Sequence, residues 1–340
     1  RGLTEHHNAL AIAENLLKAF REPFKIGGRE LILTMSIGVA VYPKNGRCAS
    51  DLLRNADTAM YQAKALGRNT YSFFTKEMNT CMQRRFEIEE QMHGALERNE
   101  FELHYQAQFN AKNENIIGAE ALLRWHNPKL GHVAPDEFIP IAEHTGLIVP
   151  IGQFVMKQAL GFLAQWQSAD QQQYTIAVNL SPRQFRDAGL LNFIKQSLSE
   201  SNISSKYLEL EITEGVLMSG QSYIHHALEQ INELGIKLSM DDFGTGYSSL
   251  SYLRQYPFDV LKIDRSFING ITSNKADYNL VKATIAMSHS LGLTVIAEGV
   301  ETAEQLQVLN KLKCDFIQGY YFSKPIPAMQ LLEFSARYYL

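Results

Sequence analysis

Eight short strand-like runs after residue 100 constrain the fold of this chain more than any other feature of its sequence. From the second run onward, helical patterns fill the gaps between them, and glycines such as Gly235 and Gly292 follow those helices. The runs cover residues 101–109, 116–125, 174–180, 207–213, 236–241, 260–264, 294–298 and 315–318. Strands that alternate with helices imply a parallel sheet, and eight strands in such a series imply a closed (β/α)8 barrel.

The join between the first two runs departs from this pattern. Only the segment from Asn110 to Asn115 separates them, whereas a crossover helix needs ~10–12 residues. We therefore expect an antiparallel hairpin at this join. The predicted fold class is α/β, an irregular TIM (β/α)8 barrel over residues 100–340 with an antiparallel first strand.

The first hundred residues predict a smaller, separate part of the chain, which suits a length of 340 residues. Residues 1–76 have the pattern of a small α/β segment with helices at 8–20 and 49–66 and strands at 31–41 and 70–74. Two strands cannot make a large sheet alone. Residues 77–99 are charged with spaced apolar side chains, which is typical of a linker helix that packs one side on a neighbour.

Composition narrows the possible partners and the compartment. A net charge of −4 offers no basic face for duplex nucleic acid. The three cysteines are widely spaced, which suits reduced thiols in a cytoplasm, and no apolar run approaches the ~20 residues of a membrane span. The first residues contain neither an initiator methionine nor a signal peptide. We expect a cytoplasmic piece of a longer sensor protein, without membrane contact in these residues, although a membrane tether could lie outside them.

Two adjacent carboxylates, Asp241 and Asp242, stand where an extended run gives way to a glycine-rich loop. Because side chains alternate between the two faces of a strand, Asp241 shares a face with Lys237 and Ser239. We expect the strand to end at Asp241 and the loop to turn Asp242 to the same side. Two like charges this close repel, so one loses its charge or a cation lies between them. Taken alone, such a pair is more often a turn than a metal site.

The same alternation places polar side chains at the ends of several strands on the face that would line the barrel. They are Glu120, Asn179, Glu211, Asp241, Lys262 and Glu298. These groups would meet at the C-terminal mouth, where barrel enzymes work, and burying them is costly unless cations and water fill the site. Carboxylate and amide oxygens without thiolate or histidine select Mg²⁺ or Mn²⁺ over zinc. Two such ions ~3.5–4 Å apart would suit attack by a metal-bound hydroxide on a phosphodiester.

Seven sequence blocks in this region resemble the EAL-domain phosphodiesterases, in order, over roughly residues 84–340. They are E-A-L-L-R-W from Glu120, N-L-S-P-R-Q-F from Asn179, E-I-T-E from Glu211, D-D-F-G-T-G-Y-S-S-L from Asp241, L-K-I-D-R-S-F from Leu261, A-E-G-V-E from Ala297 and Q-G-Y-Y-F-S-K-P from Gln318. The resemblance implies an irregular TIM barrel that cuts cyclic di-GMP to linear pGpG with Mg²⁺ or Mn²⁺.

Residues 1–76 carry a second resemblance. The words S-I-G-V-A-V-Y-P and A-D-T-A-M-Y-Q-A-K-A-L-G-R-N are similar to the C-terminal half of a GGDEF-type diguanylate cyclase domain. The G-G-D-E-F loop itself is absent, because Gly27-Gly28 is followed by Arg-Glu-Leu. We therefore interpret this part as a partial GGDEF-like segment without a nucleotide-condensing site. Whether it flanks the barrel structurally or regulates it stays open.

The EAL resemblance also implies metal ligands and catalytic groups. Glu120, Asn179, Glu211 and Asp241 would bind one ion, and Asp241 would bridge to a second ion held with Asp242 and Glu298. Lys262 would orient or deprotonate the attacking water, since nearby cations would lower its pKa. Glu298 and Gln318 would complete the catalytic centre.

Further roles follow from the same resemblance. Arg124 would clamp a phosphate, because its planar fork suits phosphate oxygens, and Gln106, Asp264 and Tyr320 would contact the substrate. Glu214 and Glu301 would anchor the D-F-G-T-G loop, which couples the site to a homodimer formed through the barrel. The family's Y-Q-P is Tyr105-Gln106-Ala107 here, which alters backbone stiffness near Gln106 and removes no ligand.

Each of three residues also has a non-catalytic explanation. Lys262 could be a surface lysine, Arg124 a salt-bridge partner and Glu214 a purely structural anchor. The alternative at the level of function is a receptor that binds cyclic di-GMP without cutting it. Such receptors typically lose a metal-facing carboxylate, and none is lost here. The sequence therefore favours the enzyme.

Overall fold

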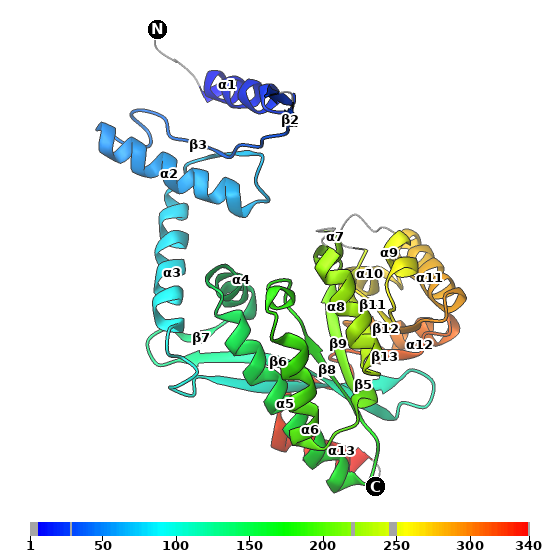
Figure 1. Ribbon diagram of the computed structural model, residues 1–340. Coiled ribbons are helices and arrows are strands. Elements are labelled where there is room, and N and C mark those ends of the chain that lie inside the picture. Colours follow the sequence, from blue (N-terminus) through cyan, green and yellow to red (C-terminus); the bar gives the residue numbers. More distant parts are fainter. Residues whose placement is uncertain (1–5, 28, 219–221, 245–249, 339–340) are drawn as a thin grey trace. The chain divides into compact units, whose positions relative to one another are not determined.

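The computed structural model describes residues 6–27, 29–218, 222–244 and 250–338 of the chain. The chain divides into two compact units, Arg1–Glu90 and Gln91–Leu340. Figure 1 shows the course of the chain through each of them.

The first unit contains α1 (His6–Ala19), α2 (Ala49–Ala65) and most of α3 (Lys76–Met92), with four short strands. β1 (Phe24–Ile26) pairs antiparallel with β2 (Arg29–Leu31), and β3 (Ile37–Val39) pairs parallel with β4 (Tyr71–Phe73). The prediction of a single strand over residues 31–41 is therefore wrong. Ile32 and Leu33 between β2 and β3 are 75% and 45% exposed, so no sheet partner buries the middle of this run, and a strand needs such a partner to persist.

Helix α3 ends at Met92 rather than at residue 99, where the predicted linker helix would have ended. Gly94 and Asn99 both adopt positive φ, at 75° and 54°. A helix cannot continue through left-handed residues. The chain therefore turns between α3 and the first strand of the barrel.

The second unit is a closed ring of eight strands. Its neighbours run in the order β5, β13, β12, β11, β10, β9, β8 and β6, and a direct pairing of β6 with β5 closes the ring. The strands are β5 (Phe101–Asn110), β6 (Ile116–Asn127), β8 (Thr175–Asn179), β9 (Leu208–Thr213), β10 (Lys237–Phe243), β11 (Val260–Ile263), β12 (Thr294–Glu298) and β13 (Phe316–Gln318). β7 (Gly131–Val133) pairs with β6, and β14 (Ile326–Pro327) with β5.

The first strand runs against the others, as the short join predicted. β5 is antiparallel to both β6 and β13, whereas the remaining neighbours in the ring are parallel. The join is a tight turn in which Asn110 donates from its N–H to the Asn115 carbonyl at 2.8 Å. The irregular TIM barrel predicted from the sequence is confirmed.

Helices cover the outside of the ring, and Figure 1 shows them beside the strands they connect. They are α4 (Pro135–Thr145), α5 (Ile148–Asp170), α6 (Leu190–Ser201), α7 (Glu214–Met218), α8 (Ser222–Glu233), α9 (Leu250–Gln255), α10 (Arg265–Gly270), α11 (Lys275–Ser290), α12 (Ala303–Lys311) and α13 (Ala328–Tyr338). On β9, Leu208, Leu210 and Ile212 are fully buried. Alternation then directs Glu209 and Glu211 to the opposite face, toward the lumen.

Candidate active site

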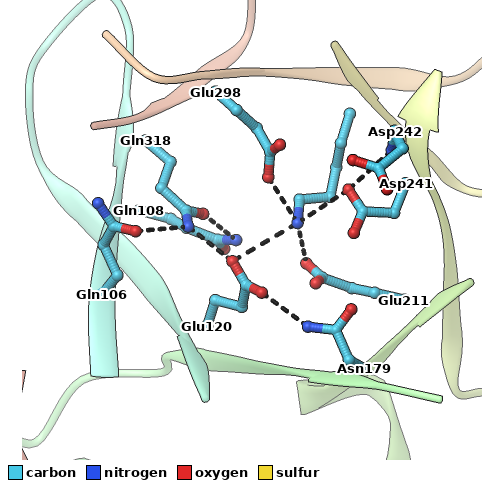
Figure 2. Close-up of polar contacts among 10 residues, drawn as sticks. Gln106, Gln108, Glu120, Asn179, Glu211, Asp241, Asp242, Glu298 and Gln318 are labelled. Atoms are coloured by element: carbon cyan, nitrogen blue, oxygen red, sulfur yellow. Dashed lines mark hydrogen bonds and ion pairs between the residues drawn. The ribbon is translucent and has the colours of Figure 1, made fainter. Parts of the chain in front are cut away.

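Strand pairing brings the predicted polar residues to one level of the barrel. Asn179, the last residue of β8, is paired with Glu211 on β9, and Glu298 at the end of β12 is paired with Gln318 at the end of β13. Glu120 on β6 stands opposite Gln106 on β5. Side chains far apart in sequence therefore point toward a common centre, as Figure 2 shows.

That centre is the ammonium group of Lys262 on β11, whose side chain is 1% exposed. Its Nζ lies within 4 Å of four carboxylates: Glu298 Oε1 at 2.7 Å, Glu211 Oε1 at 2.8 Å, Asp241 Oδ1 at 3.3 Å and Glu120 Oε2 at 3.5 Å. The alternative that Lys262 is a surface lysine is wrong. It is a buried cation at the middle of an acidic cluster.

The pKa values follow from this crowding. Burial by itself lowers the pKa of Lys262, but the surrounding carboxylates, Asp241 foremost, outweigh burial and hold it well above its ordinary value. Burial and the neighbouring Glu120 raise the pKa of Glu211 well above its ordinary value. Burial also raises the pKa of Glu298 to about 8, although Lys262 opposes the shift.

Asp242 completes the acidic cluster by a route that the sequence did not predict. β10 does not end at Asp241 but continues to Phe243, and its register with β11 shifts between Met240 and Phe243. Within this irregularity Asp242 has φ of 56°, and its N–H donates to Asp241 Oδ1 at 2.9 Å. A bulge of this kind can turn two successive side chains to one side of a strand. The expected loop turn is thus a β-bulge inside the strand.

Side-chain amides donate hydrogen bonds to both oxygens of Glu120 (Figure 2). Asn179 Nδ2 donates to Glu120 Oε1 at 2.7 Å, and Gln318 Nε2 donates to Glu120 Oε2 at 2.7 Å. Gln318 Nε2 also donates to Gln106 Oε1 at 3.1 Å, and Gln108 Nε2 donates to Gln318 Oε1 at 3.0 Å. Gln108 was not among the predicted site residues. Strand alternation could have found it, because it lies two residues after Gln106 on the same face.

The donor set fits a hard divalent cation. Asp241, Asp242 and Glu298 each offer a carboxylate oxygen, and these atoms lie within 4.8 Å of one another. Glu211 Oε2 is buried and has no hydrogen-bond partner in the part of the chain that the structure describes. Because Asn179 donates from Nδ2 to Glu120, its Oδ1 remains a possible metal ligand. Oxygen atoms of this kind are the ligands that Mg²⁺ and Mn²⁺ prefer.

The predicted substrate contacts lie in different surroundings. Arg124 on β6 is half-buried. Burial lowers the pKa of its guanidinium group, and the nearby Tyr320 and Glu120 partly offset this shift. Tyr320 is 56% exposed, with Lys324 Nζ 5.5 Å from its ring centroid. Asp264 Oδ1 accepts the N–H of Ser266 at 3.0 Å and thereby caps the N-terminus of helix α10. Arg124 and Tyr320 thus offer a cationic and aromatic surface, whereas Asp264 has a clear structural task.

The predicted loop anchors flank a segment that is only partly described. Glu214 is the buried first residue of α7, whereas Glu301 is exposed and its N–H donates to Gln305 Oε1 at 2.7 Å. Residues 245–249, which begin within the D-F-G-T-G loop and extend beyond its last glycine, lie outside the described residues. The anchoring of this loop stays a prediction.

An irregular (β/α)8 barrel with an acidic, lysine-centred mouth defines the class to which the second unit belongs. The chain is a member of the EAL domain family, whose sequence profile matches residues 89–325. The profile of the diguanylate cyclase GGDEF domain matches residues 2–70. Both predicted resemblances are confirmed.

Curated relatives extend the match over nearly the whole chain. The bifunctional diguanylate cyclase/cyclic di-GMP phosphodiesterase MucR of Pseudomonas aeruginosa is 42% identical over 96% of this chain and 48% of its own length. The cyclic di-GMP phosphodiesterase NbdA of the same organism is 39% identical over 99% of this chain and 43% of its own length. The chain therefore spans about half the length of these relatives.

Solved structures agree with the fold. The structure described as "PaMucR Phosphodiesterase, c-di-GMP complex" has a TM-score of 0.69 and 42% identity, and the match covers 72% of this chain and 99% of that one. None of the described helices has both the length and the apolar character to cross a bilayer.

Proposed function

We propose that this chain hydrolyses cyclic di-GMP to linear pGpG in a reaction that depends on Mg²⁺ or Mn²⁺, with two ions bound. One observation carries the proposal. Five carboxylates, those of Glu120, Glu211, Asp241, Asp242 and Glu298, gather around one lysine, and a buried oxygen of Glu211 is left without a hydrogen-bond partner among the described residues. Such an excess of buried negative charge is costly unless further cations offset it.

The choice of substrate rests on the relatives. MucR and NbdA are named as cyclic di-GMP phosphodiesterases, and the MucR phosphodiesterase structure is a complex with c-di-GMP. The site itself supports a phosphodiester, because half-buried Arg124 offers a planar fork to phosphate oxygens. Exposed Tyr320 offers a flat face to a purine base.

Each site residue then has a defined task. Glu120, Asn179, Glu211 and Asp241 would hold one cation, and Asp241, Asp242 and Glu298 a second. Bound divalent cations would supply an activated water and neutralise charge that develops on the phosphate. Gln318 and Asn179 hold the Glu120 carboxylate by hydrogen bonds of 2.7 Å each.

Lys262 and Glu298 form the shortest of the four ion pairs at the Lys262 ammonium group. Their Nζ and Oε1 atoms lie 2.7 Å apart, close enough to share a proton. The acidic surroundings favour the ammonium form of Lys262, which donates hydrogen bonds and orients a water or a phosphate oxygen. Without metal, burial raises the pKa of Glu298 to about 8, whereas a bound cation would hold its carboxylate ionised. Because bound cations would also lower the pKa of Lys262, both of its predicted roles, orienting and deprotonating the attacking water, stay predictions.

The decisive experiment is incubation of the chain with cyclic di-GMP and Mg²⁺ or Mn²⁺, with the products separated by chromatography. We expect linear pGpG, no turnover in the presence of a chelator, and recovery when metal is restored. Binding of cyclic di-GMP without product would instead support the receptor alternative, and turnover that a chelator leaves unchanged would contradict the metal mechanism. The homodimer through the barrel stays a prediction that analytical ultracentrifugation can test.

A further inference from the structure

We propose that Gln108 is a positioning residue that fixes the orientation of the Gln318 side-chain amide and, through it, the carboxylate of Glu120. Gln108 lies on β5 and is 1% exposed, and its Nε2 donates to Gln318 Oε1 at 3.0 Å. Figure 2 shows the Gln108 amide beside that of Gln318, joined to it by a dashed line. Its link to metal binding rests on the proposed function.

The Gln318 amide has two possible orientations. A primary amide has a donor end and an acceptor end of almost the same shape, so its surroundings must select one orientation. At Gln318 the donor end reaches Glu120 Oε2 at 2.7 Å and Gln106 Oε1 at 3.1 Å. The reversed amide would place a carbonyl oxygen against a carboxylate, which repels.

Gln108 supports the orientation of Gln318 that the Glu120 carboxylate requires. Its Nε2 donates to the Oε1 end of Gln318, so both ends of the Gln318 amide have partners when Nε2 faces Glu120. Gln318 is itself only 4% exposed, so no bulk water replaces a lost donor at this position. A buried acceptor left without its partner is costly.

The consequence reaches the cation site. Glu120 is held at both oxygens, by Asn179 at Oε1 and by Gln318 at Oε2. Partners that orient metal-binding carboxylates change metal affinity when they are lost. The Gln108 side chain donates to Gln318 rather than to a carboxylate of the acidic centre, so its effect passes through Gln318.

Two substitutions at Gln108 separate donor loss from volume loss. Gln108→Glu keeps the shape but, when ionised, presents an acceptor to the acceptor end of Gln318, which breaks this hydrogen bond and opposes the amide orientation that Glu120 requires. Gln108→Met removes the donor without adding charge. The matched control is Gln167→Glu on α5, where Nε2 donates to the Tyr174 carbonyl at 2.8 Å away from the barrel mouth.

The readouts are the Mn²⁺ dissociation constant from calorimetry, the melting temperature of the metal-free protein, and kcat with cyclic di-GMP. For Gln108→Glu we expect Mn²⁺ binding roughly tenfold weaker and a lower kcat, a smaller loss for Gln108→Met, and unchanged Mn²⁺ binding for Gln167→Glu. Gln108→Met should bind Mn²⁺ more weakly than the control even if the two variants melt at the same temperature. If Gln108→Glu fails to fold, Gln108→Met decides the question by itself.

A pH series adds a readout that a purely structural role would not move. As the pH falls, the introduced carboxyl group gains a proton and becomes a donor again. The ratio of Mn²⁺ affinity between Gln108→Glu and wild type should therefore recover at lower pH, and that of Gln108→Met should not.

Mn²⁺ affinities of both Gln108 variants within about twofold of the control would overturn the proposal. A wild-type chain that binds Mn²⁺ but leaves cyclic di-GMP intact would contradict the proposed hydrolysis and leave the Gln108 test in force. A wild-type chain that does not bind Mn²⁺ would overturn both.

Discussion

Buried carboxylates at two places in the barrel unit have opposite surroundings. Just before β5, Glu100 accepts hydrogen bonds from Arg98, from Trp125 Nε1 at 2.9 Å and from Asn127 Nδ2 at 2.9 Å. Burial alone would raise the pKa of Glu100, but the hydrogen bonds from Arg98, Asn127 and Trp125 outweigh it and hold the pKa below its ordinary value. The buried carboxylate of Glu100 therefore has hydrogen-bond donors at both of its oxygens.

At the barrel mouth, the described residues offer too few hydrogen-bond donors for the clustered carboxylates. Glu211 pairs with Lys262 at one oxygen and has no hydrogen-bond partner among the described residues at the other. The pKa values of Glu211 and Glu298 are raised, mainly by burial. A buried acid with satisfied oxygens therefore stabilises a fold, whereas acids gathered without enough donors prepare a site for an added cation.

The largest expected effect is the loss of catalysis when a carboxylate at the mouth is removed. Glu120→Ala or Asp241→Ala should lower kcat/KM for cyclic di-GMP by roughly a thousandfold or more, because each removes a proposed metal ligand. Circular dichroism should show the fold retained. Full activity in either variant would mean that the mouth is not the reaction centre.

A milder change at the mouth should separate stability from function. Glu211→Gln replaces a carboxyl group whose ionisation is disfavoured by burial and by neighbouring Glu120 with a neutral amide, and it leaves Lys262 its other three carboxylate partners. We expect the metal-free variant to melt a few degrees higher than wild type, for a gain of ~1 kcal/mol, and to bind Mn²⁺ more weakly. Lower stability of the metal-free variant would show that the wild-type carboxylate is already satisfied.

The matched substitution at Glu100 should lower the stability of the protein and leave Mn²⁺ binding unchanged. Trp125 and Asn127 both donate to Glu100 Oε2, and Arg98 donates to Oε1. The amide of Glu100→Gln therefore either turns its nitrogen toward Arg98 or removes the acceptor of both Trp125 and Asn127, which should cost about 1–3 kcal/mol of unfolding free energy. Mn²⁺ affinity and turnover should stay close to wild type. Denaturant unfolding beside calorimetric Mn²⁺ titration measures both quantities, and a fall in Mn²⁺ affinity would tie Glu100 to the site after all.

The smallest expected effect is a slope of stability with pH in the metal-free protein. Because the pKa of Glu298 is raised to about 8, the folded chain still holds a proton that the unfolded chain has released. This contribution is present below the ordinary carboxyl pKa and is lost as the pH rises from about 4.5 to about 8.

Glu298→Gln should reduce this slope, and Glu211, whose pKa is also raised, should account for part of the remainder. Glu100→Gln should not reduce the slope, because the pKa of Glu100 is lowered and its contribution is lost only as the pH falls through the acid range. Melting temperatures across this pH window, without metal and with Mn²⁺, test the difference. An unchanged slope in Glu298→Gln would place the titrating group elsewhere.

Within the barrel unit, local sequence patterns were enough to predict the eight strands of the ring with their intervening helices, the antiparallel first strand, and the lumen-facing set of polar residues. Each depends on short-range chemistry: a join too short for a helix between Asn110 and Asn115, and the alternation that separates Glu211 from Ile212. The roles assigned to the site residues went further than local chemistry and stay predictions.

The way in which these groups meet depends instead on the assembled barrel. The hydrogen bond from Gln108 to Gln318 joins residues 210 positions apart, and the Lys262 ion pairs require that four other strands stand around β11 at matching heights. The β-bulge at Asp242 and the interrupted run at Ile32 depend on which neighbour is available to pair. Such contacts are set by closure of the ring and by strand register, which no local pattern contains.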